Sequence, residues 1–396
     1  MAVPTVNFLP DDAVRSFARE HGTPVYVYSK ERLSLFAKRA MQFKGPYGTT
    51  IRYAVKANSH KEIIRLFDSM GLYFDASSGG EVELLIRFGV RPSHITLNSQ
   101  ELPDNLQDLV QKGVRFVATS LHQLETYCSL FAGSTVGVRL NPGVGNGESN
   151  KVTTGGVAAG FGIWHEYIPD IQSIAAKNKV TITMVHTHIG AGTDPLVWQE
   201  VANITLGLAE QFSTVTHVSL GGGFKVERMD DEQTADIAAI GSVISGLLRD
   251  FAKRTGRKLH VEIEPGTYLT ALSGLLLTSV QDITNTGASG YTFIRTNTGM
   301  NDILRPTLYG AQHPLWLITN SESLSTESCD YVVIGHNCES GDILTPQRGN
   351  PDMIATRTLP KANIGDIVVI GGAGAYCASM RAVGYNAFKP AKEIVI

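Results

Sequence analysis

The feature that most constrains the fold is a long alternation of short β-type segments and longer helical segments between about residues 23 and 265. Most of the β-type segments are separated by stretches with helical periodicity, such as HKEIIRLFDSMG and GEVELLIRFG. Parallel strands need crossover helices, and eight such units close a sheet, so the pattern predicts a (β/α)₈ barrel. The eight expected strands are TIRYAVKA, YFDASS, HITLNS, RFVATS, TVGVRL, TITMVHTH, HVSLGG and KLHVEIE.

The chain changes character after residue 265, where β-type segments dominate and helical patterns become rare. Gly, Asn and Asp turn signals between these segments favour a mainly antiparallel β domain, and the first residues of the chain are expected to pair with it. We therefore assign residues 27–267 to the barrel, and residues 1–26 plus 268–396 to a β-rich second domain. Its expected strands include LLLTSVQDIT, YTFIRTN, YVVIG, DIVVIGG and KEIVI.

Composition excludes several classes of function. The chain has 396 residues, 18% charged residues and a formal charge of −3, with no basic run to neutralise a nucleic-acid backbone. We find no signal-peptide pattern and no apolar stretch long enough to span a membrane, so no membrane partner is expected. Few, irregularly spaced cysteines indicate a reducing cytoplasm rather than a disulfide framework or a metal site. They are Cys128, Cys329, Cys338 and Cys377.

Lys56, in YAVKANSH, directly follows the core of the first expected strand. Functional groups of a barrel gather at the carboxyl ends of its strands, so this lysine stands where chemistry is expected. We expect the side chain to be buried, which would favour the neutral amine and make Lys56 a candidate nucleophile for a Schiff base. The alternative is a lysine whose charged end simply extends into solvent from a strand end.

Three further strand ends carry polar or glycine-rich sequences. HTHIGAG places His186 and His188 on one side of a strand, as cofactor-stacking rings or as hydrogen-bonded core histidines. The segment SLGGGF is either an anion-binding loop or a flexible turn. In EIEPG, Glu264 lies either in the barrel opening or on the surface. With Lys56, these groups supply an amine, a flat ring, a phosphate site and a carboxylate for a ring nitrogen. This set predicts pyridoxal phosphate (PLP) as cofactor.

Seven ordered motifs resemble those of the diaminopimelate decarboxylase family, a group of fold-type III PLP-dependent decarboxylases that also includes ornithine and arginine decarboxylases. The resemblance extends over nearly the whole chain. The motifs are YAVKANSH, HTHIGAG, SLGGGF, EIEPG, GMNDILRPTLYG, GHNCESGD and GAGAYCASM.

The resemblance implies cofactor-binding roles for particular residues. Lys56 would bind PLP covalently, His188 would stack on the ring, and Glu264 would pair with the ring nitrogen. Asp75, in YFDASS, and Arg139, in VGVRLNPG, would line the cofactor pocket. The phosphate would be held by Gly221, Gly222, Gly223, Gly266 and Tyr376.

The resemblance also implies the reaction, which is decarboxylation of meso-diaminopimelate to L-lysine and CO₂ by a homodimer with shared active sites. Arg305 and Tyr309 would bind the far end of the substrate, as would Tyr376. Cys338 would protonate Cα across a two-fold interface, with Glu339 reaching across beside it. Taken singly, these residues have simpler interpretations. Arg305 and Tyr309, four residues apart, could be a surface pair on a helix, and Cys338 could be a small buried hydrophobic residue.

Three positions depart from the family pattern: Thr267 replaces an arginine after EPG, Ala191 replaces the serine of HIGS, and Asn297 replaces an aspartate before GMND. The missing arginine leaves open a decarboxylase for another amino acid, in siderophore, antibiotic or polyamine synthesis. A non-catalytic PLP-binding protein is the weaker alternative, because the second domain and CESGD are both present. A racemase fits less well, because it would need a base on the second face of the cofactor.

Overall fold

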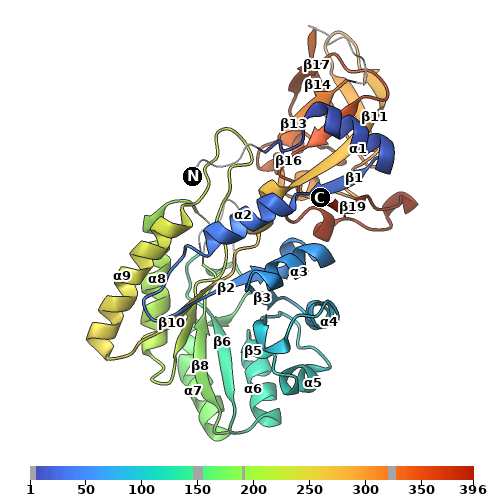
Figure 1. The fold of residues 1–396 in the computed structure, drawn as a ribbon. Helices are drawn as coiled ribbons and strands as arrows, with labels where there is room; N and C mark the ends of the chain where they lie inside the picture. Colours follow the sequence, from blue (N-terminus) through green and yellow to red (C-terminus); the bar gives the residue numbers. More distant parts are fainter. Residues whose placement is uncertain (1–5, 146–154, 190–191, 320–326) are drawn as a thin grey trace. The chain divides into compact units, whose positions relative to one another are not determined.

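The computed structural model describes residues 6–145, 155–189, 192–319 and 327–396 (Figure 1). The chain forms two compact units. We call Ser34–Lys225 with Gln233–Leu269 the barrel unit. We call Met1–Leu33, Val226–Glu232 and Thr270–Ile396 the β unit. No helix among the described residues has both the length and the apolar character needed to cross a bilayer.

The barrel unit contains a closed parallel sheet of eight strands, which confirms the predicted (β/α)₈ barrel. The order is β5-β4-β3-β2-β10-β9-β8-β6, and pairing of β5 with β6 closes it. A short extra strand, β7 (Ile163–Trp164), pairs with β6. All eight barrel strands coincide with predicted segments. They are β2 Thr49–Ala54, β3 Tyr73–Ala76, β4 Ile95–Leu97, β5 Arg115–Ala118, β6 Thr135–Asn141, β8 Thr181–His186, β9 His217–Ser219 and β10 His260–Ile263.

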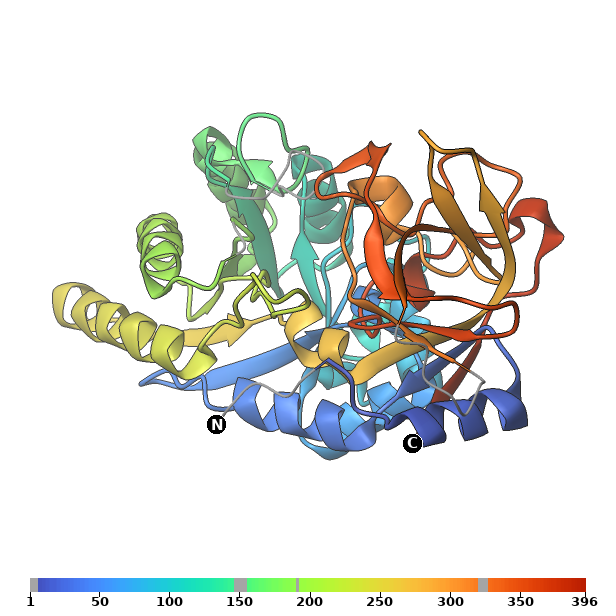
Figure 2. The ribbon, with the colours of Figure 1, turned by 90° about the horizontal axis from the view of Figure 1, so that it is seen from above.

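Helices follow the strands and cover the outside of the barrel, and α8 and α9 lie side by side there in Figures 1 and 2. Local sequence defines several of their starts: the Ser78 hydroxyl accepts from the backbone N–H of Glu81, and the Ser120 hydroxyl accepts from that of Gln123. Neither α5 nor α9 was predicted from the sequence. The helices are α2 Lys30–Ala40, α3 Lys61–Ser69, α4 Gly79–Arg87, α5 Leu106–Gln111, α6 Leu121–Leu130, α7 Ile168–Lys177, α8 Pro195–Glu210 and α9 Ile237–Thr255.

The β unit is built on a sheet with the path β13-β18-β11-β12-β14-β17. The N-terminal strand β1 pairs antiparallel with β11 and parallel with the C-terminal strand β19. The sheet is mainly antiparallel, as predicted, although β12 and β14 are also parallel. Its strands are β1 Val25–Tyr28, β11 Gly274–Asn285, β12 Thr292–Thr296, β13 Leu315–Ile318, β14 Ser328–Ile334, β17 Arg357–Pro360, β18 Ile367–Ile370 and β19 Lys392–Val395.

Smaller elements complete the β unit. The helix α1 (Asp11–His21) buries Val14 in an apolar core with residues of β1, β11, β13 and β18. A hairpin of β15 (Pro346–Gln347) and β16 (Asn350–Ile354) lies next to the one-turn helix α11 (Arg305–Tyr309). The sequence analysis did not identify β13, β15, β16 or β17.

Asn297 has a structural explanation in the β unit. Its side-chain oxygen accepts hydrogen bonds from the Thr278 hydroxyl (2.7 Å) and the Ser279 N–H (2.9 Å). Its amide nitrogen donates to the Thr23 carbonyl at 2.8 Å. An ionised aspartate has no N–H to donate, so asparagine suits this position better than the aspartate of the family pattern.

Candidate functional site

Lys56 lies in a short 3₁₀ turn (Val55–Ala57) directly after β2, at the carboxyl end of the barrel strands, which we call the C-terminal mouth. Val55 and Ala57 are buried, whereas Lys56 is exposed. The expectation of a buried lysine is therefore wrong. The turn directs its two apolar neighbours into the core and leaves the amine of Lys56 accessible from the C-terminal mouth.

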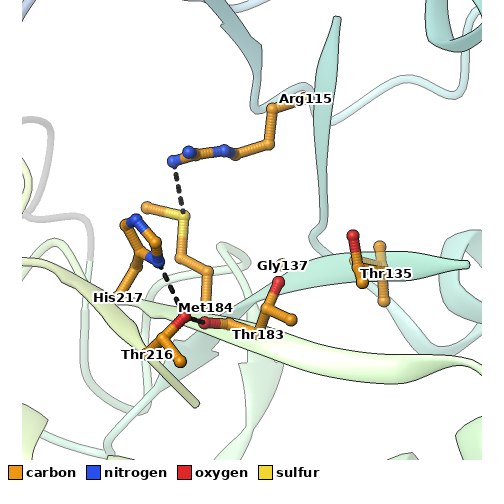
Figure 3. Close-up of a pocket in the computed structure, with 8 residues that line it drawn as sticks. Arg115, Thr135, Gly137, Thr183, Met184, Thr216 and His217 are labelled. Carbon is orange, nitrogen blue, oxygen red and sulfur yellow. Dashed lines mark hydrogen bonds between the residues drawn. The ribbon is translucent and has the colours of Figure 1, made fainter. Parts of the chain in front are cut away.

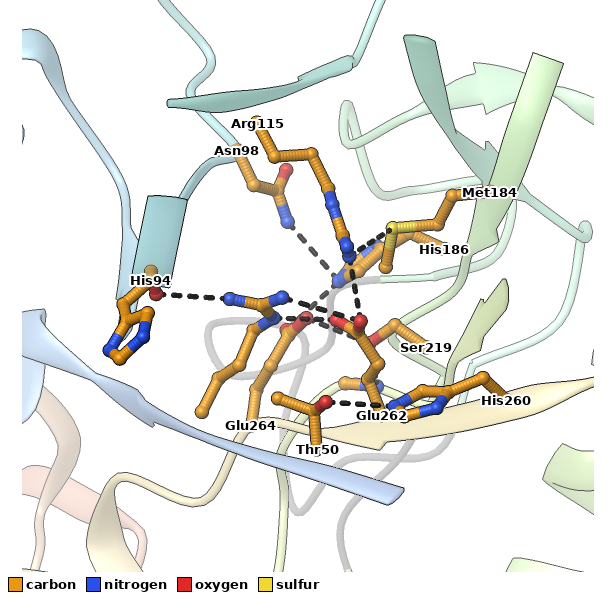
Figure 4. A network of polar contacts seen from close by, with 12 residues as sticks. Thr50, His94, Asn98, Arg115, Met184, His186, Ser219, His260, Glu262 and Glu264 are labelled. Carbon is orange, nitrogen blue, oxygen red and sulfur yellow. Dashed lines mark hydrogen bonds and ion pairs between the residues drawn. The ribbon is translucent and has the colours of Figure 1, made fainter. Parts of the chain in front are cut away.

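A buried polar network surrounds Glu264, the first residue after β10 (Figure 4). The Ser219 hydroxyl donates to Glu264 Oε1 at 2.7 Å, and His186 Nε2 lies 2.9 Å from Glu264 Oε2. His186 Nε2 also lies 3.2 Å from the amide nitrogen of Asn98. These side chains come from the ends of β4, β8, β9 and β10, so four strands jointly fix the Glu264 carboxylate.

The network keeps Glu264 ionised. Burial alone would raise its pKa, but the neighbouring His186 and the hydrogen bonds from His186 and Ser219 lower the pKa to about 2. Asp75, in β3, behaves in the opposite way. Burial and the nearby Glu264 raise its pKa well above the usual value, and its Oδ1 atom has no hydrogen-bond partner among the described residues. The C-terminal mouth thus contains one fixed anion and one carboxyl group that disfavours ionisation.

His188 packs against the glycine-rich loop that follows β9. Its Nδ1 accepts a hydrogen bond from the Gly222 N–H at 3.1 Å. A Cβ atom at Gly221, where φ is +70°, would lie 2.5 Å from this Nδ1. At Gly222, a Cβ atom would lie 2.5 Å from the Glu264 carbonyl oxygen, so both positions need glycine. Burial and the nearby cations Arg139 and Lys56 lower the pKa of His188 to about 3, so its ring is neutral.

Arg139 extends the same group of residues from β6. It is buried, stacks over the Phe161 ring at 5.1 Å from the guanidinium carbon to the centroid, and donates to Asn98 Oδ1 at 3.5 Å. Gly266 and Thr267 follow Glu264 directly, with Gly266 buried and Thr267 partly buried. Ala191 lies outside the described residues. The structure therefore places the predicted barrel residues Lys56, Asp75, Arg139, His188, Gly221, Gly222, Gly223, Glu264 and Gly266 at the C-terminal mouth.

In the β unit, Arg305 and Tyr309 are the first and last residues of α11, one turn apart. Both are partly buried, and the buried Nε of Arg305 has no hydrogen-bond partner in the described part of the chain. Gly310 ends the helix with φ of +63°, where a Cβ atom would lie 2.4 Å from the Asn350 nitrogen. Arg305 is thus held in place with hydrogen-bonding capacity left for an anion.

Cys338 and Glu339 lie on an exposed loop after β14. Asp342 organises this loop: its carboxylate accepts from the Met300 N–H (2.6 Å) and from the backbone and side-chain N–H groups of Asn337 (2.9 and 2.7 Å). Cys338 itself donates its N–H to Asn386 Oδ1 at 2.7 Å. The loop therefore presents both predicted residues on the surface of their own chain.

Tyr376, in GAGAYCASM, is partly buried and has φ of +56°. This left-handed backbone conformation costs free energy in any residue that has a Cβ atom. Residues strained in this way are concentrated at functional sites.

Sequence reasoning missed three residues of these networks, namely Asn98, Ser219 and Asp342. It named His186 but missed its part as a partner of Glu264. Serine and asparagine at strand ends are common, so only the position of Ser219 two residues before a glycine run could have pointed to it. The arrangement as a whole can hold a cationic ring against Glu264 beside an accessible amine.

Comparison with known proteins gives a consistent result. The family model described as "Pyridoxal-dependent decarboxylase, pyridoxal binding domain" matches residues 33–271. Diaminopimelate decarboxylase of Escherichia coli (strain K12) is 30% identical over 375 residues, covering 93% of this chain and 87% of that protein. The enzyme of the same name from Streptomyces coelicolor is 30% identical over 386 residues, covering 96% of this chain and 86% of the relative.

Solved structures agree. A crystal structure of diaminopimelate decarboxylase has a TM-score of 0.90 at 28% identity, covering 99% of this chain and 94% of the other. The Helicobacter pylori diaminopimelate decarboxylase complexed with L-lysine has a TM-score of 0.82 at 26% identity, covering 96% of this chain and 93% of the other.

Proposed function

Because the chain belongs to the pyridoxal-dependent decarboxylase family, we propose that it converts meso-diaminopimelate to L-lysine and CO₂. The predicted family, the PLP cofactor and the assignment as an amino-acid decarboxylase are confirmed by the family match and the relatives. The observation that carries the proposed function is the buried, ionised Glu264 at the same mouth of the barrel as the accessible Lys56.

The residues of the C-terminal mouth fit PLP. A carboxylate with a pKa of about 2 suits a cationic ring nitrogen, and Asp75 Oδ1 is a buried acceptor that has no partner among the residues that the structure describes. Lys56 would hold the cofactor covalently, the neutral His188 would lie against its ring, and Glu264 would pair with the ring nitrogen. Asp75 and Arg139 would line the pocket. The phosphate would be held by Gly221, Gly222, Gly223, Gly266 and Tyr376.

PLP supplies an electron-accepting ring that stabilises the negative charge left on Cα when the substrate carboxylate departs as CO₂. This chain's residues provide the conditions for that chemistry. Glu264 would keep the ring nitrogen protonated, because an anion fixed by His186 and Ser219 favours a positive charge beside it. Lys56 would supply the amine that holds the cofactor when no substrate is bound.

Arg305 supports a substrate with a negatively charged far end. Its buried Nε, which has no partner in the described ranges of the chain, favours a carboxylate, and an uncharged or cationic side chain would leave this donor unsatisfied. We propose that Arg305 and Tyr309 bind the distal end of the substrate, together with Tyr376 and Glu339. This requirement distinguishes meso-diaminopimelate from ornithine.

We also propose a homodimer located in the cytoplasm. The exposed Cys338 and Glu339, on a loop held by Asp342, suit a position in the active site of a second copy. The partner's Cys338 would then protonate Cα after CO₂ departs. We also propose that the protein binds an amino-acid substrate and does not bind nucleic acid.

Thr267 favours one second candidate, a decarboxylase for another amino acid. A threonine cannot supply the cation that the family pattern has after EPG, so the substrate would carry one anionic group fewer or bind it through another residue. Replacing Thr267 by arginine distinguishes the two candidates: raised activity toward meso-diaminopimelate would favour the second, and unchanged activity the first.

The direct experiment is measurement of CO₂ release from meso-diaminopimelate by the purified, PLP-loaded protein, with L-lysine identified as product. We expect release by the native chain, none by Lys56→Ala, and full activity in the surface control Lys112→Ala. Arg305→Gln should raise KM at least about tenfold, whereas the exposed Arg295→Gln should not. Absence of CO₂ release from a protein that binds PLP would contradict the proposed substrate.

A further inference from the structure

A cavity lies toward the opposite end of the barrel strands, which we call the N-terminal mouth, and Figure 3 shows the residues that line it. Its volume is about 260 Å³, and it lies entirely within the barrel unit. The lining comes from the starts of β5, β6 and β9 and from the middle of β8, on the amino-terminal side of the residues proposed to bind PLP. The lining residues are Arg115, Thr135, Val136, Gly137, Thr183, Met184, Thr216 and His217.

Two backbone features shape this cavity. Val136 pairs with Ile182, but Gly137 pairs with Met184, so Thr183 is an additional residue in β8 and forms a β-bulge. Bulges redirect side chains and occur preferentially at the rims of barrels and beside functional sites. A Cβ atom at Gly137 would lie 2.9 Å from Val117 Cγ2 and 3.4 Å from Met184 Cβ, so a side chain would not fit there. A glycine inside a strand often marks such a close approach.

Arg115 provides the charge of the cavity. Its Nη1 donates to Glu262 Oε1 at 2.6 Å and contacts Met184 Sδ at 3.7 Å, as Figure 3 shows for the sulfur contact. Its Nε and Nη2 have no partner within the ranges that the structure describes, and the side chain is 37% exposed. The Nε–Nη2 edge of an arginine is a planar fork that matches the two oxygens of a carboxylate or phosphate.

The charges around the cavity favour an anion over a metal ion. His217, His260 and Glu262 could hold a metal, because one ligand atom of each lies within 4.8 Å of the others. However, Glu262 already accepts from both Arg52 and Arg115, and two fixed cations would repel a third (Figure 4). Burial and Arg115 lower the pKa of His217 to about 4, so it is neutral near pH 7. Two arginines and one carboxylate leave a net positive charge.

We propose that the N-terminal mouth is a binding site for a small oxyanion, a carboxylate or a phosphate group, held by the Nε–Nη2 edge of Arg115. Thr183 adds a hydroxyl group to the lining, and Met184 supplies an apolar wall for a short ligand body. The Thr216 hydroxyl already has hydrogen-bond contacts with His217 Nδ1 (2.8 Å) and the Thr183 carbonyl (3.4 Å). The site is separate from the proposed decarboxylation site and does not depend on the identity of the substrate.

The test follows the methyl resonance of Met184 in PLP-loaded protein labelled with ¹³C-methyl methionine, assigned with Met184→Leu. Acetate and inorganic phosphate are titrated separately at constant ionic strength. We expect the phosphate group of PLP to occupy the phosphate site of the C-terminal mouth. A response to added inorganic phosphate therefore reports binding at the N-terminal mouth. We expect a saturable shift of the Met184 signal with at least one anion, and the anion that causes it identifies the ligand class.

Arg115→Gln should weaken this binding at least about tenfold, because it removes a charge-assisted pair of hydrogen bonds. Arg254→Gln, which removes an exposed arginine paired with Glu210, should leave it unchanged. If Arg115→Gln does not fold, Arg115→Lys is tested in its place, because it keeps a cation beside Glu262. This variant should also weaken anion binding, because lysine lacks the planar Nε–Nη2 edge of arginine. Absence of a saturable shift with both anions, or native affinity in the Arg115 variants, would overturn the proposal.

Discussion

Glu262 and Glu264 lie two residues apart at the end of the same chain segment, and both are buried carboxylates with a pKa of about 2. Their partners differ. Glu262 pairs with the guanidinium groups of Arg52 and Arg115, whereas Glu264 has hydrogen bonds with His186 and Ser219. Two permanent cations neutralise Glu262 within the barrel, whereas the partners of Glu264 stabilise its charge and leave it available to a cationic ligand. The same residue type is thus structural at one position and suited to a cofactor two residues further along the chain.

The largest expected effect comes from Glu262→Gln. Removing this charge leaves Arg52, which is almost fully buried, without its ion-pair partner, so the free energy of unfolding should fall by about 3–5 kcal/mol. Urea unfolding of the holoprotein measures this loss, with the exposed Glu210→Gln as control. At a temperature where the variant is folded, kcat should stay within a few-fold of the native value. A loss of activity without a loss of stability would contradict the structural role.

Glu264→Gln should show the opposite pattern. It removes the charge opposite the proposed ring nitrogen, so kcat should fall by about 10²–10³-fold, similar to loss of other preorganised electrostatic groups. Its unfolding free energy should change less than that of Glu262→Gln, because neither His186 nor Ser219 carries a permanent charge that would be left unpaired. Steady-state kinetics and urea unfolding of both variants, side by side, measure the comparison. Native turnover in Glu264→Gln would contradict the proposed role.

Acid should unfold the protein partly through Glu262. Its pKa is about 2 in the folded chain against an ordinary 4.5, so the stabilisation it provides is fully present above about pH 4.5. That stabilisation, about 3 kcal/mol, is lost as the pH falls from about 4.5 toward 2. Unfolding free energies between pH 6 and 3 should therefore fall less steeply in Glu262→Gln than in the native chain. Parallel curves for the two proteins would show that Glu262 is not a source of the acid sensitivity.

The smallest expected effect is that of Ser219→Ala. It removes one of the hydrogen bonds that keep Glu264 ionised, worth about 1–2 kcal/mol for a bond to a charged group. We expect PLP affinity to weaken about tenfold and the fold to remain intact. Equilibrium dialysis against PLP measures the affinity, and Ser242→Ala, at an exposed serine on α9, is the control. Unchanged affinity would show that Ser219 does not support Glu264.

The barrel strands could be predicted because they are buried on both faces, so each appears as a short continuous apolar segment between helical patterns. The strands of the β unit were less regular. The short β15 and β16 contain many exposed residues and little apolar alternation, so their sequences resemble loops. The helix α5, with six residues, is too short to show a clear period.

The candidate site was predictable where a residue type is unusual for its position, as for Lys56 and Glu264 at strand ends. The exposure of Lys56 could not be predicted, because it depends on the 3₁₀ turn of residues 55–57. Ser219 and Asp342 also could not be identified, because their importance comes from tertiary hydrogen bonds to residues distant in the sequence. Asp342, for example, contacts Met300 across 42 positions.

The most direct measurement is the ¹⁵N NMR chemical shift of the ring nitrogen in protein loaded with ¹⁵N-labelled PLP. The account predicts a protonated ring nitrogen in the native chain and in Glu262→Gln, and loss of that protonation in Glu264→Gln. An unprotonated ring nitrogen in the native protein, or a protonated one in Glu264→Gln, would contradict the claim that the buried Glu264 is kept ionised for the cofactor.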